Sequence, residues 1–399
     1  MKAMKIHSLE ARPILDSRGD WTVEVSLETK DGVRAVASAP EGKSTGSSEA
    51  RAFPAKRAVR NVNERIAPWM ARNDFKDQVA LDAFLCKLDG TPLKAKLGAN
   101  AVLPVSVAFA RATALAKRIP LWRLIRLNLG DKKLANGKRS AYPRLFINVI
   151  NGGLHAGNNL DFQEYLVIPK CRTIAKSVDV GVKLYHALGN ALEKKKGRTA
   201  VDLGDEGGFA PNFKNNLEPF RILWSVAKKL HLENEIDLGM DAAATNIKRI
   251  GDKKLEATYI KLVQDYKLIY IEDPFGEKDF LAFAALNLHF KDKTWIAGDD
   301  LTTTNVRNMM RAHAEESVNA VIVKPNQIGT VTEALNAVRL ARKYGWAVIA
   351  SHRSGETDDD FIADFAYGVR ADGIKLGAPA RGERDAKYNR LLEIETREA

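Results

Sequence analysis

The feature that most constrains the fold is a series of short apolar segments in the second half of the chain, each ending beside an ionisable residue. These residues recur at intervals of 23 to 31 positions, about the length of one strand, one helix and two loops. They are Asp241, Glu272, Asp299, Lys324, His352 and Lys375. The carboxyl ends of the strands of a closed parallel barrel meet at one mouth. The six side chains are therefore expected to surround one small volume.

The same part of the chain alternates short apolar segments with amphipathic stretches. Near-continuous apolar runs are typical of strands buried on both faces of a parallel sheet. We predict an α/β barrel over residues 140–399, although nine candidate strands are found where a barrel needs eight. The candidates are LFINVI, QEYLVI, TAVDLG, IDLGMD, LIYIED, TWIAGD, NAVIVK, WAVIAS and DGIKLG.

The first part of the chain, residues 1–139, has a mixed α+β pattern. The alternation in WTVEVSLET (21–29), followed by KDG and VRAVASA, predicts a β-hairpin. Helical periodicity follows over 47–70, 76–88 and 99–118, with Pro54 and Pro104 as boundary or kink positions. A polar stretch rich in Gly and Lys before Tyr142 places the domain boundary near residue 139.

The charge and the apolar runs bear on partners and location. The chain has 62 Lys and Arg against 50 Asp and Glu, a net charge of +12, which favours anionic partners. The basic runs contain no interleaved aromatic residues, so no dedicated nucleic-acid site is expected. We see no apolar run long enough to span a membrane and no apolar core of a secretory signal near the start. A cytoplasmic location is expected.

Three of the six residues are carboxylates on consecutive strands. Asp241, Glu272 and Asp299, without His or Cys among them, form an oxygen ligand set that suits Mg²⁺ or Mn²⁺ better than zinc. Alternatively, these acids form structural salt bridges with neighbouring lysines. Near a cation, desolvated Lys324 and Lys375 are expected to have a lowered pKa, the condition for a lysine to act as a base.

Two further motifs supply polar groups. Glu164 lies in FQEYLVIP, and Glu206 lies in GDEGG, where the glycines let the backbone approach a ligand closely; an exposed turn is the alternative. In SHRSGET, Arg353 and Ser354 suit a phosphate group, since arginine donates a bidentate pair of hydrogen bonds. The alternative is a helix-capping loop closed by an Arg–Glu356 pair.

These motifs carry a family resemblance over nearly the whole chain. The sequence resembles the enolase family in ILDSRG, LGANAVL, NVINGGLHAGN, QEYLVIP, GDEGGFAPN, GMDAAA, IEDPF, GDDLTTTN, KPNQIGT, SHRSGET, IKLGAP and ERDAKYNRLLEIE. The resemblance implies an N-terminal α+β capping domain and a modified TIM barrel of the enolase type, ββαα(βα)6. A start of this kind would explain the surplus strand.

The resemblance also implies roles for the metal ligands and proton-transfer groups. Asp241, Glu272 and Asp299 resemble the ligands of one Mg²⁺, and Ser44 resembles the loop residue that binds a second. Lys324 resembles the base that removes the C2 proton of 2-phosphoglycerate. Glu206 resembles the acid that helps the 3-hydroxyl depart. Glu164 resembles its partner acid, and His155 resembles the mobile-loop histidine.

The substrate-binding residues are implied in the same way. Lys375 resembles the lysine that faces the substrate carboxylate, and Gln163 is grouped with it. His352, Arg353 and Ser354 match the phosphate side. The activity implied is the Mg²⁺-dependent, reversible dehydration of 2-phosphoglycerate to phosphoenolpyruvate in glycolysis and gluconeogenesis. A homodimer or a higher homo-oligomer is implied as well.

The chemistry agrees with this residue set. A proton next to a carboxylate is weakly acidic because its removal creates a dianion, and divalent cations offset the developing charge. Hydroxide is a poor leaving group, so an acid must protonate it. Two alternatives stay open: another superfamily member that acts on a different carboxylate, and a catalytically inactive binding protein that uses its positive charge.

The chain departs from the family pattern in the capping part. Where the family usually has SGASTG, this chain has Glu41-Gly42-Lys43-Ser44-Thr45-Gly46, which introduces two charges into a loop expected to close over the substrate. Asp20 and Trp21 replace the Asn-Pro of SRGNPT, and Pro104 replaces a glycine. These changes bear on loop closure and on the second metal.

Overall fold

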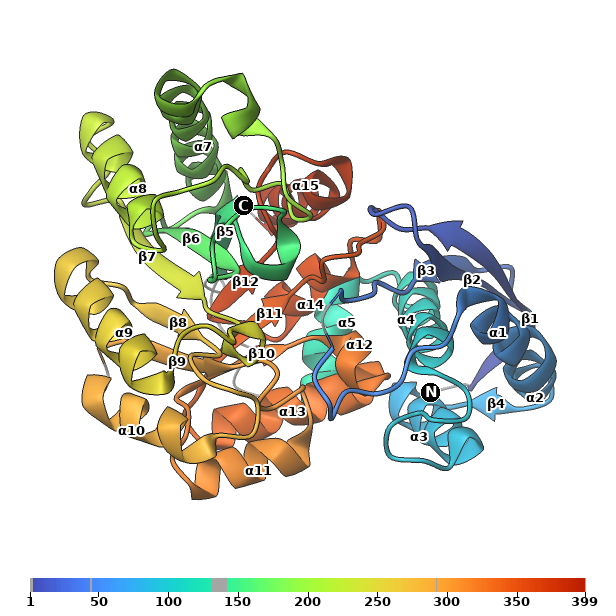
Figure 1. The fold of residues 1–399 in the computed structure, drawn as a ribbon. Coiled ribbons are helices and arrows are strands. Elements are labelled where there is room, and N and C mark those ends of the chain that lie inside the picture. The colour runs from blue at the N-terminus through green and yellow to red at the C-terminus, as the bar shows by residue number, and fades with distance from the viewer. Residues whose placement is uncertain (1–2, 44, 131–141, 292, 399) are drawn as a thin grey trace.

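The computed structural model describes residues 3–43, 45–130, 142–291 and 293–398. Figure 1 shows an eight-stranded barrel surrounded by helices, with a smaller α+β unit packed against one side. The predicted fold class, a modified TIM barrel with an N-terminal capping domain, is confirmed. The predicted boundary near residue 139 lies outside the described residues.

The N-terminal unit is a four-stranded antiparallel sheet in the order β3-β2-β1-β4. Its strands are β1 (Met4–Leu15), β2 (Trp21–Thr29), β3 (Arg34–Ser38) and β4 (Asp74–Phe75). The predicted hairpin is β2 and β3, and alternate residues of β2 are buried, among them Val23 and Val25. Strand β1 was not predicted, because the register shifts between Ile6 and Ser8 and its buried positions are unevenly spaced.

The helices of this unit lie on one face of the sheet, and the last of them packs against the barrel helices instead of the sheet. They are α1 (Ala55–Arg60), the π-helical η1 (Asn61–Ile66), α2 (Ala67–Met70), α3 (Gln78–Asp89), α4 (Ala99–Ala116) and α5 (Leu121–Leu129). The helix predicted from residue 47 begins only at Ala55, directly after Pro54, because the residue before a proline is disfavoured in the helical region. Pro104 lies inside α4 rather than at its boundary.

Helix α4 corrects the expectation that no segment is long enough to span a membrane. Its 18 residues have a mean hydropathy of 1.4, which by length and composition would suffice. Of this window, 83% is buried inside the protein, where α4 packs against β2 and β3. Among the described residues it is the one helix that meets that test.

The barrel closes in the strand order β10-β11-β12-β5-β6-β7-β8-β9. The strands are β5 (Arg144–Asn151), β6 (Glu164–Pro169), β7 (Ile236–Asp241), β8 (Tyr270–Glu272), β9 (Trp295–Gly298), β10 (Ala320–Val323), β11 (Ala347–Ser351) and β12 (Gly373–Lys375). Strand β6 runs antiparallel to both β5 and β7, and the other pairs are parallel. The surplus candidate, TAVDLG, is not a strand: it overlaps the 3-10 helix η3 (Arg198–Val201) and has one isolated bridge at Leu203.

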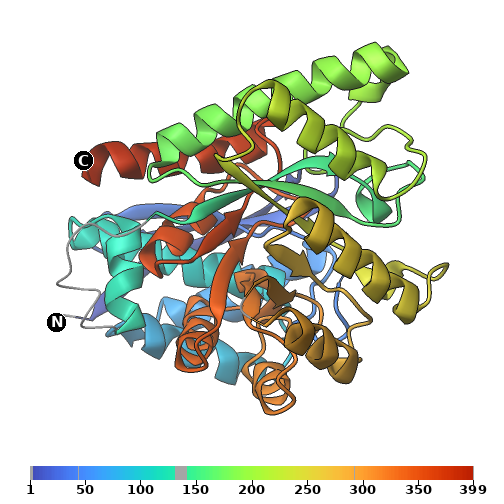
Figure 2. The same cartoon turned by 90° about the vertical axis from the view of Figure 1, so that its left-hand side faces the viewer.

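The barrel helices form an outer layer, and Figure 2 shows α7 and α15 lying across one side of the barrel. They are α7 (Ile174–Lys196), α8 (Glu218–Lys229), α9 (Asp252–Tyr266), α10 (Phe280–Phe290), α11 (Val306–Ala314), α12 (Pro325–Ile328), α13 (Val331–Lys343), α14 (Phe361–Gly368) and α15 (Gly382–Glu398). Inward side chains fill the barrel, and Phe146 packs edge-on against Tyr270 at 4.9 Å between ring centroids. This packed interior fixes the positions at which the strands end.

Replacing Phe146 by alanine tests the packing of the barrel interior. The ring is fully buried, so Phe146→Ala is expected to lower the free energy of unfolding by about 3–5 kcal/mol, the usual cost of such a cavity. Leu127→Ala, at a position 51% exposed on α5, is the control and should change it by less than about 0.5 kcal/mol. Urea unfolding measures the free energy of unfolding of both variants. Equal losses in the two variants would contradict the placement of Phe146 in the packed barrel interior.

Candidate active site

The predicted ionisable residues gather at the carboxyl ends of the barrel strands. Asp241 ends β7 and pairs in register with Glu272 at the end of β8, and Lys375 ends β12. Lys324 directly follows β10, where Pro325 begins α12 and prevents the strand from continuing. A pocket at this mouth is lined by Asp241, Asp299, Lys324 and His352, and by Gln163, Glu164 and Glu206 from the first strands and loops.

Two lysines occupy the centre of the carboxylate cluster. The Nζ atom of Lys375 lies 2.6 Å from Glu272 Oε2, 3.0 Å from Glu164 Oε2 and 3.7 Å from Asp241 Oδ2. Lys324 pairs with Asp299 Oδ2. All of these side chains are at most 12% exposed. The sequence left two interpretations of these acids open, metal ligands or structural salt bridges. The two are compatible, because the expected metal ligands also form salt bridges with the lysines.

The protein groups alone raise the pKa of both lysines; the lowered values were predicted for lysines that also lie near a cation. Burial acts to lower the pKa of Lys324, but the surrounding acids, Asp299 first and then Glu272, together outweigh it. For Lys375, burial is outweighed by Glu164 and Glu272, so its pKa lies well above the ordinary range. The reason is that each ammonium group lies directly against an acid, and the attraction exceeds the desolvation cost.

The pKa values of several carboxyl groups at the mouth are raised as well, which disfavours their charged form. Burial, and then the neighbouring charge of Asp241, raise the pKa of Glu272 to about 7. Burial also raises the pKa of Asp241 despite Lys375. The mouth thus holds more acids than its two lysines neutralise, which is an arrangement that binds cations well.

The donor set fits a divalent cation that prefers oxygen ligands. Glu272 Oε1 is buried and accepts no hydrogen bond within the described part of the chain. Asp241 accepts from the Gln163 amide at 3.2 Å and from the Ala243 N–H at 2.8 Å, which fixes its orientation. Carboxylate oxygens held in this way suit Mg²⁺.

Two tighter groups of candidate ligands also occur among the described residues. In each group one ligand atom per residue lies within 4.8 Å of the others. One group is His155, Glu164 and Glu206, and the other is Asp273, Asp299 and Asp300. Of the three predicted ligands, only Asp299 belongs to one of these groups. The predicted ligands Asp241, Glu272 and Asp299 are instead paired with Lys375 and Lys324. Asp273 had no assigned role; its carboxylate accepts the N–H groups of Asp299 and Asp300 at 2.9 and 2.7 Å.

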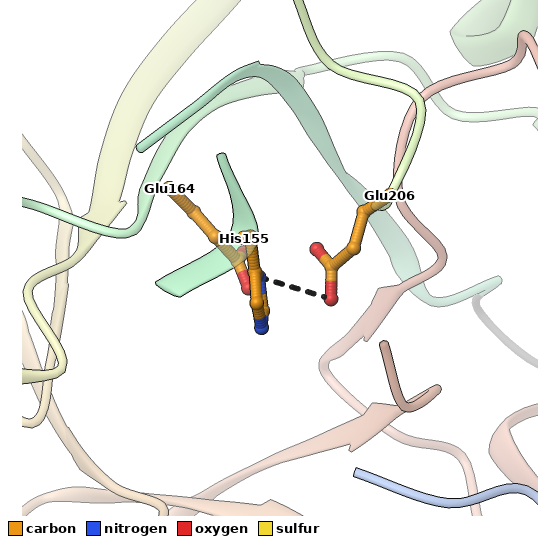
Figure 3. Close-up of side chains that lie close together, drawn as sticks. All are labelled: His155, Glu164 and Glu206. Carbon is orange, nitrogen blue, oxygen red and sulfur yellow. Dashed lines mark ion pairs between the residues drawn. The ribbon is translucent and has the colours of Figure 1, made fainter. Parts of the chain in front are cut away.

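Glu206 faces two histidines across from the lysines. Figure 3 shows the ion pair between His155 Nδ1 and Glu206 Oε1, which are 3.5 Å apart, with Glu164 beside them. His352 Nε2 is also 3.5 Å from Glu206 Oε1, and the Asn148 amide donates to Oε2 at 2.9 Å. Positive φ at Gly207 allows the tight loop that turns Glu206 inward.

The paired acids Glu164 and Glu206 have pKa values that are pushed apart. Burial and the charge of Glu206 raise the pKa of Glu164 well above its ordinary value. For Glu206, burial acts in the same direction, but His352 and His155 outweigh it and leave its pKa well below the ordinary value. Two neighbouring acids with such different environments take different protonation states near neutral pH.

Arg384 is a site residue that sequence analysis missed. It is fully buried and donates to His352 Nδ1, to the Arg353 carbonyl and to the Ser354 carbonyl, each at 2.6 Å. Because arginine has only donors, Nδ1 of neutral His352 is the acceptor and its proton sits on Nε2, facing Glu206. ERDAKYN contains this arginine, but the motif alone gives no sign of its partners.

The phosphate-side residues reach toward the capping unit. Arg353 is buried and donates to both oxygens of Glu49, at 2.8 and 3.2 Å, and Glu49 was not predicted. Ser354 Oγ accepts the Lys43 N–H at 2.8 Å. A Cβ atom at Gly42 would lie 1.9 Å from Arg353 Nη2, so any larger residue there would displace the Arg353 guanidinium. The Arg353–Glu356 pairing considered from the sequence is a backbone contact, from the Arg353 N–H to Glu356 Oε1 at 3.0 Å.

The other positions singled out in the capping unit are not among the residues that line the mouth pocket in the described part of the chain. Ser44 lies outside the described residues. Trp21 is 62% exposed at the start of β2, and Asp20 lies beside Arg18 at 3.5 Å. Pro104 is buried within α4 and is absent from the residues that line the mouth pocket.

The fold and the site together define a class: a capped α/β-barrel enzyme whose mouth combines acids with lysines that could remove a proton. The family description "Enolase, N-terminal domain" matches residues 6–125, and "Enolase, C-terminal TIM barrel domain" matches residues 139–399. Proteins named enolase from Methanopyrus kandleri and Solanum lycopersicum are 42% and 40% identical, each over 98% of this chain and 95% of their own length. The enolase of Methanocaldococcus jannaschii is 41% identical over the same shares.

The chain therefore belongs to the enolase family. The expected resemblance and enzyme class, a phosphopyruvate hydratase among the lyases, are confirmed. The family also implies a divalent metal.

The environment of His352 predicts its protonation behaviour. Burial, together with Arg384, lowers its pKa from 6.5 to about 4, although Glu206 acts against this shift. The unfolded chain thus binds a proton here that the folded protein does not. This contribution to stability is fully present above about pH 6.5 and is lost as the pH falls toward 4.

Histidine-selective NMR between pH 7 and 4 measures this directly. The signal of the His352 ring is assigned by comparison with His352→Asn. The ring should stay neutral as the pH falls from 7 and become protonated only near pH 4. A midpoint close to 6.5 would show that the ring is not held by Arg384 as described.

Proposed function

We propose that this chain catalyses the Mg²⁺-dependent, reversible dehydration of 2-phosphoglycerate to phosphoenolpyruvate, with Lys324 as the base at C2 and Glu206 as the acid at the 3-hydroxyl. The observation that carries the proposal is that Lys324 and Glu206 line one pocket from different elements, as a base and an acid acting on adjacent carbons require. Asp241, Glu272 and Asp299 are proposed to hold one Mg²⁺, and Ser44 a second.

Lys324 must be neutral to accept the C2 proton. Its Asp299 partner keeps the pKa of Lys324 raised, so any interaction that draws Asp299 away favours the neutral amine. The chemistry supplied by bound Mg²⁺ is positive charge, which offsets the charge that develops on the substrate carboxylate. Arg353 alongside adds further repulsion to a protonated Lys324.

The proton for the leaving hydroxyl is proposed to come from the pair of Glu206 and Glu164. Because the pKa of Glu164 is raised and that of Glu206 is lowered, one proton resides on the pair near neutral pH, mainly on Glu164. Glu206 is proposed to take up this proton from Glu164 as it protonates the leaving hydroxyl. His155, His352 and the Asn148 amide contact Glu206 and hold it in place.

Substrate binding is assigned to the two sides of the pocket. Lys375 is proposed to face the substrate carboxylate, with Gln163 beside it, because the buried Gln163 Oε1 accepts no hydrogen bond from the described residues. His352, Arg353 and Ser354 are proposed to bind the phosphate. Glu49 keeps the Arg353 guanidinium oriented for this contact.

A coupled assay for phosphoenolpyruvate tests this assignment. With Mg²⁺ and 2-phosphoglycerate the wild type should turn over, and chelation of the metal should stop it. Lys324→Ala and Glu206→Gln should each lower kcat by about a hundredfold to ten-thousandfold, the usual worth of a general base or acid. Lys261→Ala, on the exposed face of α9, is the matched control and should keep full activity. Ordinary turnover by both site variants would refute the roles.

We also propose that the chain divides into a capping domain, residues 1–139, and a catalytic domain, residues 140–399. A homodimer or higher homo-oligomer and a cytoplasmic location are proposed from the family. No dedicated nucleic-acid site is proposed, because the positive charge follows no recognition motif.

Light scattering coupled to size-exclusion chromatography tests the assembly. The expected mass is twice 44.1 kDa, or a larger multiple, at micromolar concentration. A mass of 44.1 kDa that does not change with concentration would contradict the proposed oligomer.

A further inference from the structure

The segment that joins β3 to α1 crosses the mouth of the active-site pocket. Gly42 lines the pocket itself, and Figure 1 shows this segment passing beside α12. The Pro40 carbonyl accepts from Asn326 at 3.2 Å, and the Ala50 N–H donates to the Gln327 carbonyl at 2.8 Å. The two ends of the crossing are thereby attached to the barrel.

The middle of the segment is seated on the phosphate-side residues. Glu41 and Gly355 exchange backbone hydrogen bonds of 2.8 and 2.9 Å, and the Lys43 N–H donates to Ser354 Oγ. These hydrogen bonds can form only when this part of the chain lies against the phosphate-side residues.

One side-chain contact ties the same segment to the opposite wall. The Nζ atom of Lys43 lies 3.0 Å from Asp205 Oδ2. Asp205 directly precedes Glu206; its N–H donates to the His155 carbonyl at 3.0 Å, and its carbonyl accepts from Arg384 at 3.2 Å. The Lys43–Asp205 pair therefore spans the mouth, from the capping unit to the loop that carries the proposed acid.

We propose that Lys43 is a positioning residue that holds residues 40–43 closed over the pocket by pairing with Asp205. This inference rests on the proposed function only for its kinetic consequence. The family pattern has alanine at this position, so the pair is a feature of this chain rather than of the fold. Closing the segment in advance lowers the binding free energy that the substrate must spend on closure.

The strength of the contact follows from its exposure. The Lys43 side chain is 45% exposed and that of Asp205 is 24% exposed, so the attraction is modest and screened by salt. An exposed ion pair of this kind corresponds to about a two- to fivefold change in an equilibrium. The same range is expected for both measurements below.

Hydrogen–deuterium exchange of the enzyme without substrate tests the closure itself, whatever the reaction. In Lys43→Met and in Asp205→Asn, amides of residues 38–50 should exchange about two- to fivefold faster than in the wild type at low salt. The double variant should exchange no faster than the faster single variant. Lys170→Met is the matched control: its pair with Asp237 at 2.9 Å has similar exposure, 43% and 17%, but lies away from the mouth.

Steady-state kinetics test the consequence for the substrate. Lys43→Met should raise the KM for 2-phosphoglycerate about two- to fivefold without lowering kcat, and the difference from the wild type should shrink in 0.5 M KCl. A lowered kcat with unchanged KM would overturn the positioning role. A Lys43→Met effect on KM that keeps its full size when the substitution is made in the Asp205→Asn variant would also overturn it, because that effect could not depend on the pair.

The two measurements separate the possible failures. Unchanged exchange in both single variants overturns the inference even if the enzyme turns over 2-phosphoglycerate. Faster exchange in a protein that lacks this activity supports the closure and contradicts only the proposed function.

Discussion

The ion pairs of two buried lysines with the acids at the barrel mouth are the interaction on which the rest of the site depends. Lys375 contacts Glu164 and Glu272, and Lys324 contacts Asp299. Removing one partner of such a buried pair commonly costs about 3–5 kcal/mol, because a charge is left uncompensated. The barrel can hold these groups together because they meet at one mouth, where the lysines and the acids neutralise one another. The acids that remain in excess provide the ligands for a cation.

Around this centre, the surrounding residues fix orientation rather than supply chemistry. Arg384 sets the tautomer of His352, which in turn faces Glu206. Glu49 orients Arg353 from the capping unit, and Asp273 holds the backbone of the Asp299 segment. The site is thus built from both parts of the chain, and neither part forms the pocket alone.

The sequence predicted what depends on local order. Regular intervals between strand-ending residues indicated one barrel mouth, and eight of the nine candidate strands are strands of the barrel. TAVDLG failed because a short apolar run cannot be distinguished from a 3-10 turn by composition. The contacts of Glu49, Lys43 and Arg384 join segments far apart in the chain, and no local pattern reports such distances. The raised pKa values of the two lysines likewise depend on which acids lie nearest, and no local pattern reports that.

Exchange of the C2 proton of 2-phosphoglycerate with deuterium from solvent tests the central claim most directly, since it isolates the step assigned to Lys324. With Mg²⁺ present, the account predicts exchange in the wild type and in Glu206→Gln, which keeps the base and loses only the acid, and none in Lys324→Ala. Exchange at the wild-type rate in Lys324→Ala, with the fold intact by circular dichroism, would contradict it.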